Sequence, residues 1–220
     1  VTKVTPTSTP ATSSGPQGVP QTGTPVFKEG DPAVPIDMTK QMTFDDGQPK
    51  KTVAGVGEYT INSDGSITFT PDKKYVGTPA AVTVKRVDEN GTEVRATYTP
   101  TVTEVTPRST NAVSSGLQGQ PQSGKPTFTP GDKAVPIDMS QPMTFEDNQT
   151  TKKVDKVGTY VIESDGTITF TPDKQYVGTP SPVTVKRVDT NGTEVTATYT
   201  PTVTRVTPTS TNAESTGLQG

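Results

Sequence analysis

The chain contains no cysteine, no histidine and no tryptophan among its 220 residues. Without cysteine it can form no disulfide, no thiolate metal site and no cysteine nucleophile. Without histidine it lacks the commonest general base and the commonest side-chain metal ligand. These absences exclude most catalytic constellations. The sequence therefore predicts no enzyme, no catalytic, cofactor-binding or metal-binding residue, and no cofactor.

Long apolar runs and an excess of one charge are also missing. No stretch approaches the roughly 18 apolar residues that a membrane helix requires. The 20 basic and 23 acidic residues nearly balance, for a net charge of −3 at pH 7, and they form no basic patch of the kind that binds nucleic acid. We therefore expect no membrane and no nucleic acid as partner, and a monomeric fragment.

Hydrophobic residues are scarce, at 27% of the chain, against roughly 45–50% in an average globular domain. Threonine and valine are abundant instead, and their β-branched side chains suit strands and lower helix stability. The 22 prolines and 20 glycines mark turns and loops. No segment has a helical period, so the composition predicts an all-β protein with extended connections.

The chain repeats itself with a period of 101 residues, the spacing that separates Val4, Val105 and Val206. The repeated segments follow one another without insertion or deletion: residues 33–38 recur at 134–139, 67–73 at 168–174, 75–79 at 176–180 and 82–88 at 183–189. A period of this length is typical of an independent domain, because solenoid units are much shorter. We expect two tandem modules from a parent protein that continues in both directions.

The boundaries follow from the change in composition along each period. Between the apolar stretches lie segments made almost entirely of Ser, Thr, Gly, Gln, Pro and Asn, which are typical of extended linkers. An alternative is that this polar chain lies along the following domain, with Leu117 and Phe128 as anchors. The predicted organisation is the end of a preceding repeat plus linker at 1–24, a β-sandwich repeat at 25–106, a linker at 107–125, a second β-sandwich repeat at 126–207, and the start of the next linker at 208–220.

Two hairpins are the clearest structural signals in the first module. Alternating polar and apolar residues flank Asp64-Gly65 in one and Asn90-Gly91 in the other, and glycine supplies the positive φ that such turns need. About six or seven short strands in each module indicate an immunoglobulin-like β-sandwich. The predicted strands are 58–61, 66–69, 82–87 and 93–98 in the hairpins, with further strands at 34–38, 42–44 and 102–105.

The apolar residues of these strands form the predicted core. Burial of each large side chain contributes about 1.5–3 kcal/mol, enough for a small domain of modest stability. The second module repeats the set 101 positions later. The predicted core of the first module is Val34, Ile36, Met38, Phe44, Tyr59, Ile61, Ile67, Phe69, Tyr75, Val82, Val84, Val94, Ala96 and Tyr98.

Acidic turns are the only candidates for a cation site. Asp45-Asp46-Gly47 and Asn62–Gly65 offer oxygen atoms, but neither has the alternate spacing and distal glutamate of a calcium loop. We interpret both as turns. The sequons at Asn90, Asn148 and Asn191 match N-glycosylation sites, and we interpret the Asn-Gly pairs among them as hairpin turns.

Three further patterns have a functional and a structural interpretation. Lys85 and Lys186, with Asp37 and Asp138, could form isopeptide cross-links, but solvated lysines on outer strand faces are the preferred interpretation. Tyr75 and Tyr98 could bind a ligand as surface aromatics, although a chain with few aromatic residues is expected to use them in its core. The Thr-rich linkers, with Ser13-Ser14, could accept O-linked sugar or form a plain flexible connection.

The run Ile67–Lys73, followed by Tyr75–Pro79, Val82–Asp88 and Asn90–Val94, resembles the CshA-type fibril repeat, and so does the tail Ala96–Thr103. Such repeats build the stalk of CshA-like surface adhesins of streptococci. The resemblance covers both modules and the segments between them. It implies a long extracellular protein, anchored to a Gram-positive cell wall, whose repeats form a fibril and whose ligand-binding parts lie mainly outside the repeats.

Two functions remain open at this point. In the first, the modules are structural spacers that project a binding tip from the cell surface, with neighbouring repeats of the same chain as partners and host surface components bound through the parent protein. In the second, each repeat binds a host protein or glycan weakly and the array gains avidity. Exposed residues that match in both copies, such as Lys85-Arg86 and Lys186-Arg187, would carry that binding.

Overall fold

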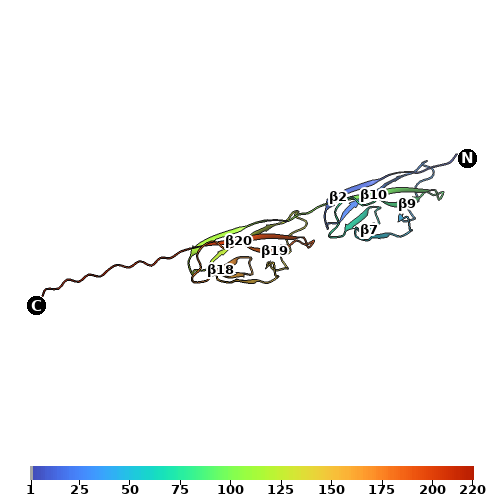
Figure 1. The fold of residues 1–220 in the computed structure, drawn as a ribbon. Coiled ribbons are helices and arrows are strands. Elements are labelled where there is room, and N and C mark those ends of the chain that lie inside the picture. Colours follow the sequence, from blue (N-terminus) through green and yellow to red (C-terminus); the bar gives the residue numbers. More distant parts are fainter. Residues whose placement is uncertain (1) are drawn as a thin grey trace. The chain divides into compact units, whose positions relative to one another are not determined.

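The structure is a computed structural model and describes residues 2–220; Val1, with which the predicted segment 1–24 begins, lies outside the described residues. Within residues 2–220 the regular elements are β-strands, and no helix there is long and apolar enough to cross a membrane. The chain forms two compact units, one built around the residues up to Arg108 and one around Ser109–Phe128, Met139–Arg187 and Val195–Gly220 (Figure 1).

The strands recur in the same order in both repeats, as their near-identical sequences require. In the first repeat they are β1 (Thr7–Thr9), β2 (Ala11–Pro16), β3 (Gln21–Gly23), β4 (Val26–Lys28), β5 (Thr43–Phe44), β6 (Lys50–Val53), β7 (Gly57–Ile61), β8 (Ile67–Pro71), β9 (Val82–Val87) and β10 (Glu93–Thr103). In the second they are β11 (Arg108–Thr110), β12 (Ala112–Leu117), β13 (Gln122–Gly124), β14 (Thr127–Thr129), β15 (Thr144–Phe145), β16 (Thr151–Val154), β17 (Gly158–Ile162), β18 (Ile168–Pro172), β19 (Val183–Val188) and β20 (Glu194–Thr204).

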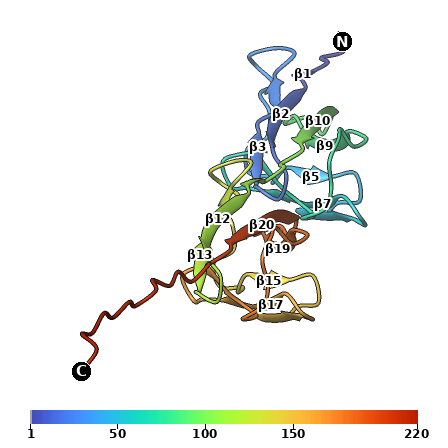
Figure 2. The same ribbon diagram turned by 60° about the vertical axis from the view of Figure 1, so that its left-hand side comes forward.

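Two four-stranded sheets make up the sandwich of each repeat. Their strand orders are β2-β10-β9-β5 and β3-β8-β7-β6 in the first repeat, and β12-β20-β19-β15 and β13-β18-β17-β16 in the second. A short antiparallel pair, β1-β4 or β11-β14, accompanies them. The ribbon in Figure 2 shows the polar strands β2 and β3, and likewise β12 and β13, lying along the sheets of their own repeat. The predicted all-β fold with tandem sandwich modules is confirmed.

Both predicted hairpins are confirmed. β7 and β8 pair antiparallel from Gly57↔Pro71 to Ile61↔Ile67, and β9 and β10 pair from Val87↔Glu93 to Val82↔Tyr98. Gly65 and Gly91 have φ values of 83° and 80°, the left-handed conformation for which the two turns need glycine. Burial alternates along β10, because side chains of successive residues point to opposite faces of a sheet.

Aromatic side chains fill the space between the two sheets. The ring of Tyr59 stacks on Phe69 with centroids 4.5 Å apart and meets the edges of Phe44 and Tyr98 at 6.5 and 6.2 Å. The predicted core residues that are buried are Phe44, Tyr59, Ile67, Phe69, Val82, Val84, Val94, Ala96 and Tyr98. Met42 and Val102 are buried as well, although the prediction did not include them.

The segment 34–38 differs from its prediction. It forms only the isolated bridges Asp31↔Val34 and Ile36↔Asp88 instead of a strand, because Pro35 has no N–H to donate and Asp37 turns the chain by accepting hydrogen bonds from Thr39. Met38 is therefore 72% exposed, and its place in the predicted core was wrong. Val34, Ile36, Ile61 and Tyr75 are partly buried. Of the predicted strand 102–105, residues 102 and 103 form the end of the 11-residue strand β10, and residues 104 and 105 lie outside it.

The polar segments predicted as linkers contain strands of the sandwich. Residues 107–125 carry β11, β12 and β13, and each pairs with a strand of its own repeat, namely β14, β20 and β18. In the structure this polar chain lies along the following repeat, as in the alternative organisation. Of its two suggested anchors, Phe128 packs against the core, whereas Leu117 is 55% exposed. Small and β-branched polar residues can form a strand, provided that the N–H and C=O groups of its backbone are paired with a neighbouring strand.

Only residues 104–107 separate the last strand of the first repeat from the first strand of the second. Residues 205–220 form no strand. They correspond to β11 and β12, whose partner strands β14 and β20 lie further along the chain in the second repeat.

Candidate functional site

The entering and leaving strands of each repeat lie side by side. The chain enters the sandwich through β2 and leaves it through β10, and the two strands pair parallel from Ala11↔Tyr98 to Pro16↔Thr103. β10 is long enough to pair first with β9, over Glu93–Tyr98, and then with β2. In the second repeat β12 and β20 pair in the same way, from Ala112↔Tyr199 to Leu117↔Thr204.

A chain of side-chain hydrogen bonds ties the polar strands to the core. Ser13 Oγ donates to Gln21 Oε1 at 2.5 Å and lies 2.7 Å from the hydroxyl of Tyr98. Gln21 Nε2 donates to the carbonyl oxygen of Thr101 at 3.1 Å. Because Ser13 gives its only proton to Gln21, Tyr98 is the donor to Ser13. The set, called here the Ser–Gln–Tyr link, joins β2 and β10 of one sheet to β3 of the other.

The second repeat contains the same link with nearly the same geometry. Ser114 Oγ donates to Gln122 Oε1 at 2.5 Å and lies 2.6 Å from the hydroxyl of Tyr199, while Gln122 Nε2 donates to Thr202 O at 3.1 Å. A glycine makes room for each tyrosine ring. A Cβ atom on Gly23 would lie 2.3 Å from Tyr98 Cε2, and one on Gly124 would lie 2.5 Å from Tyr199 Cε2.

The two buried tyrosines of the first repeat differ in how their hydroxyls are satisfied. Burial raises the pKa of Tyr59 to about 12, and the hydroxyl has no hydrogen-bond partner among the described residues. Burial also raises the pKa of Tyr98, but the bond to Ser13 opposes that rise. In the second repeat Tyr160 corresponds to Tyr59, with a pKa raised by burial and an unpartnered hydroxyl within residues 2–220.

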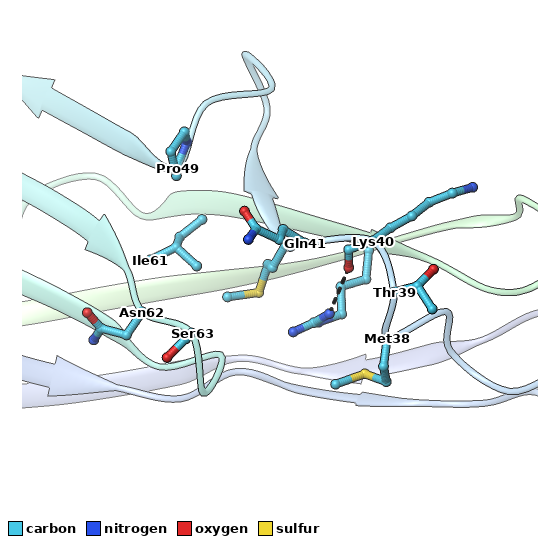
Figure 3. A pocket seen from close by; sticks show the side chains of 10 residues that line it. Met38, Thr39, Lys40, Gln41, Pro49, Ile61, Asn62 and Ser63 are labelled. Atoms are coloured by element: carbon cyan, nitrogen blue, oxygen red, sulfur yellow. Dashed lines mark hydrogen bonds between the residues drawn. The ribbon is translucent and has the colours of Figure 1, made fainter.

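A pocket of about 380 Å³ opens on the surface of the first repeat (Figure 3). Figure 3 shows Ile61 and Asn62 on one side, and Met38 and Lys40 on the loop opposite. Arg86 also lines it, donates through Nη1 to the backbone carbonyl of Lys40 at 3.3 Å, and has its pKa lowered by partial burial. Figure 3 shows the Lys40 side chain extending away from Ile61 and Asn62, so it is Arg86 that brings positive charge to the pocket. An arginine beside methionine and isoleucine side chains can bind a carboxylate that carries an apolar neighbour.

Two acidic residues lie close to this pocket. Lys40 is 3.7 Å from the carboxylate of Asp37, and Arg86 also lines an adjoining pocket of about 210 Å³ together with Asp64 and Phe27. The guanidinium carbon of Arg86 is 6.0 Å from the centre of the Phe27 ring, within the range of a cation–π contact. The Lys40 carbonyl and the Phe27 ring position the Arg86 guanidinium at the pocket.

The corresponding pocket of the second repeat is smaller and differently charged. Its volume is about 130 Å³. Arg187 takes the place of Arg86 and donates to the carbonyl of Gln141 at 3.1 Å. Gln141 stands where the first repeat has Lys40, and Glu163 stands where it has Asn62. One cation has been lost and one carboxylate gained, so the second pocket is the weaker site for an anion.

The residues singled out from the sequence occupy ordinary structural positions. Asp46 and Asp64 accept backbone hydrogen bonds within their own turns, from Gln48 N and Ser66 N, as the turn interpretation predicts. The described residues contain no group of three or more acidic side chains able to hold a metal ion. Lys85 lies 3.9 Å from Glu93, on the outer face of its strand.

Sequence reasoning missed the Ser–Gln–Tyr link. Ser13, Gln21 and Gly23 looked like linker residues because no apolar pattern surrounds them. A usable signal was present, since Ser114, Gln122 and Gly124 stand 101 positions later. A flexible linker has no physical reason to keep a particular serine, glutamine and glycine in register.

The family model of the surface adhesin CshA repetitive domain matches residues 3–102 and again 104–203. The solved repeat domain 13 of the fibrillar adhesin CshA from Streptococcus gordonii is 63% identical over 32% of this chain and 90% of that one, with a TM-score of 0.19. No curated protein matches the chain.

Tandem domains from other proteins are also similar to it. An I9–I11 tandem from titin is 12% identical, with 91% of this chain and 66% of that chain covered and a TM-score of 0.37. Drosophila N-cadherin EC1–3 is 14% identical, with coverages of 91% and 68% and a TM-score of 0.32. The two family matches span nearly the whole sequence, and the chain therefore belongs to the surface adhesin CshA repetitive-domain family as two tandem adhesin repeats.

Proposed function

We propose that the chain is a stalk segment of a fibrillar adhesin anchored to the cell wall, in which each repeat acts as a spacer that holds a binding tip away from the cell surface. The observation that carries this proposal is the folding of the polar segments into the sandwich. Because β11, β12 and β13 belong to the second repeat, only residues 104–107 connect the repeats. Such a connection spans at most about 14 Å even when fully extended.

A spacer of this kind gains length in fixed steps. A 19-residue flexible linker, as predicted for 107–125, would let the distance between repeats vary widely. With the linker residues folded, each 101-residue period adds one rigid unit and one short connection. Near-identical copies fit this role, since every copy adds length without needing a new binding surface.

Small-angle X-ray scattering on one repeat and on two repeats tests the proposal. We expect the maximum dimension to increase by about the length of one folded repeat, with a sharply defined distance distribution. The matched control carries a Gly/Ser insertion between Thr106 and Pro107, which should broaden the distribution without changing the melting temperature of either repeat. A compact two-repeat particle, or a distribution that the insertion does not broaden, would contradict the spacer role.

A second function, weak adhesion by individual repeats, is favoured by one observation, the pocket beside Arg86. The arginine and the apolar walls of this pocket suit an acidic peptide, and an array of repeats would bind such a peptide with avidity. The test is an NMR titration of the two-repeat chain with a capped Leu-Glu-Leu peptide. Weak adhesion predicts shifts around Met38 and Arg86 that disappear in the Lys40→Gln/Asn62→Glu variant, which gives the first pocket the residues of the second. Unchanged spectra would contradict weak adhesion and leave the spacer role as the one supported function.

A further inference from the structure

The direction of the terminal strands decides how a repeat responds to tension. β2 and β10 are adjacent and parallel over six residue pairs, and they are the strands through which the chain enters and leaves the sandwich. Tension on the two ends of a repeat pulls β2 toward its N-terminal end and β10 toward its C-terminal end. The two strands are therefore pulled in opposite directions along their common axis.

Pulling along the strand axis loads the hydrogen bonds of the ladder together. Strands can separate in this geometry only by sliding, and sliding breaks the evenly spaced bonds of a parallel ladder at the same moment. When two strands are pulled apart from one end, the bonds break one after another and each carries the whole load alone. A single hydrogen bond contributes little to stability, so loading all of the bonds at once makes the larger barrier.

Further contacts strengthen the ladder at its end. Gln17 N donates to the carbonyl oxygen of Thr103 at 2.8 Å, and Thr103 Oγ1 donates to Gly15 O at 3.2 Å. The Ser–Gln–Tyr link resists the same sliding, because Ser13 bonds to Tyr98 across the two strands and Gln21 bonds to Thr101. Upstream, β1 pairs with β4 over only three residue pairs, so β2–β10 is the longer ladder in the load path.

The second repeat is built to the same plan. β12 and β20 are parallel over six residue pairs, and Gln118 N donates to Thr204 O at 2.8 Å. Thr204 Oγ1 donates to Gly116 O at 3.1 Å. The arrangement is therefore a property of the repeat, and in an array every copy would carry the same load.

We propose that each repeat is a load-bearing unit whose parallel terminal strands, locked by the Ser–Gln–Tyr link, resist unfolding when the chain is pulled from its ends. The inference rests on the proposed stalk role, since tension passes through every repeat only if the repeats lie in series between a surface and a tip. The polar segment then has a mechanical purpose, because it supplies the strand that closes the load path within each repeat.

Single-molecule force spectroscopy on the two-repeat chain tests the proposal by changing the pulling direction. The chain has no cysteine of its own, so pairs of introduced cysteines define where the handles attach. Thr2→Cys with Glu104→Cys loads the β2–β10 ladder along its axis. Pro20→Cys with Glu104→Cys pulls the same ladder apart from one end. Thermal melting of both variants, measured first, establishes that they fold equally well.

We expect the first handle pair to give a high unfolding force and the second to lose that high-force event. Equal forces in the two directions would overturn the proposal. Adding Ser13→Ala should lower the force for the first pair and leave the second nearly unchanged, whereas an equal loss in both directions would mean that Ser13 stabilises the fold without locking the strands. Low axial forces combined with stepwise scattering lengths would refute the clamp and leave the spacer role intact.

Discussion

The polar and the apolar parts of each repeat reach the same sandwich by different means. The hairpins β7–β8 and β9–β10 bury aromatic and branched apolar side chains between the sheets. The polar strands β2 and β3 bury little beyond Ala11, Gln21 and the backbone at Gly23, and they are held by backbone pairing and the Ser–Gln–Tyr link. The difference shows that a segment with linker composition can be structural when its partners lie in a distant part of the chain.

The sharpest test of this comparison is removal of the polar part. A fragment of residues 126–207 contains every apolar strand of the second repeat but lacks β11, β12 and β13. It leaves the edges of β18 and β20 without partners. A small domain has a net stability of only about 5–15 kcal/mol, and we expect the fragment to lose cooperative thermal melting in circular dichroism.

The matched control for that fragment is residues 104–207, which adds only the polar segment. It should melt in one cooperative transition. Identical melting of the two fragments would show that the polar strands are accessory, and that the boundaries predicted at 107–125 describe the folding unit after all.

The second largest effect is expected at high pH, which should lower the free energy of unfolding through a tyrosine in the apolar part. The pKa of Tyr59 is raised to about 12 by burial, whereas an unfolded tyrosine titrates near 10. The unfolded chain therefore loses its proton first, and the stabilisation present below pH 10 falls by about 1.4 kcal/mol for each pH unit until the folded tyrosine also ionises. Urea denaturation between pH 9 and 12 should show this decline.

Tyr59→Phe isolates the contribution of that hydroxyl. The variant should have a flatter dependence of unfolding free energy on pH in the first repeat, while the second repeat, which retains Tyr160, keeps its slope. A slope in the first repeat that is unchanged by the substitution would place the alkaline sensitivity elsewhere.

At neutral pH, removal of each tyrosine hydroxyl should have a different effect on the free energy of unfolding, because one hydroxyl contacts the polar strands and the other lies among the apolar ones. Tyr98→Phe removes the donor to Ser13 and weakens a buried link, so we expect a loss of about 1–2 kcal/mol. Tyr59→Phe removes a hydroxyl that has no partner within residues 2–220, so its cost should be near zero. Chemical denaturation of both variants gives the comparison, and equal losses would show that the link contributes nothing beyond ring packing.

The sequence predicted what depends on local patterns and missed what depends on distant partners. Asp64-Gly65 and Asn90-Gly91 sit between alternating strands, so each hairpin is encoded within a few residues. The pairing of Ala11 with Tyr98 joins residues 87 positions apart, and serine and threonine leave no apolar period along β2. The prediction for Met38 was wrong because a local apolar pattern was given too much weight: this residue lies beside a proline-containing turn and was assigned to a strand.

The pockets could not be predicted for a related reason. Arg86 lies on a polar position of β9, and only the fold brings it beside Met38 and Ile61. Once the repeats are aligned, the replacement of Lys40 by Gln141 and of Asn62 by Glu163 is visible in the sequence. The effect of these two replacements on anion binding becomes clear only from the structure, in which the four residues line equivalent pockets.

The smallest expected effect lies at the end of β12. Leu117 is the large apolar residue of the polar segment, yet it is 55% exposed, and the first repeat has Pro16 at the same place in the register. Leu117→Pro should therefore change the unfolding free energy of the second repeat by less than about 0.5 kcal/mol. Phe128→Ala, which removes a ring packed against the core, should cost at least about 1 kcal/mol. If the leucine substitution proved the costlier of the two in urea denaturation, the end of β12 would contribute more to stability than the packed ring of Phe128.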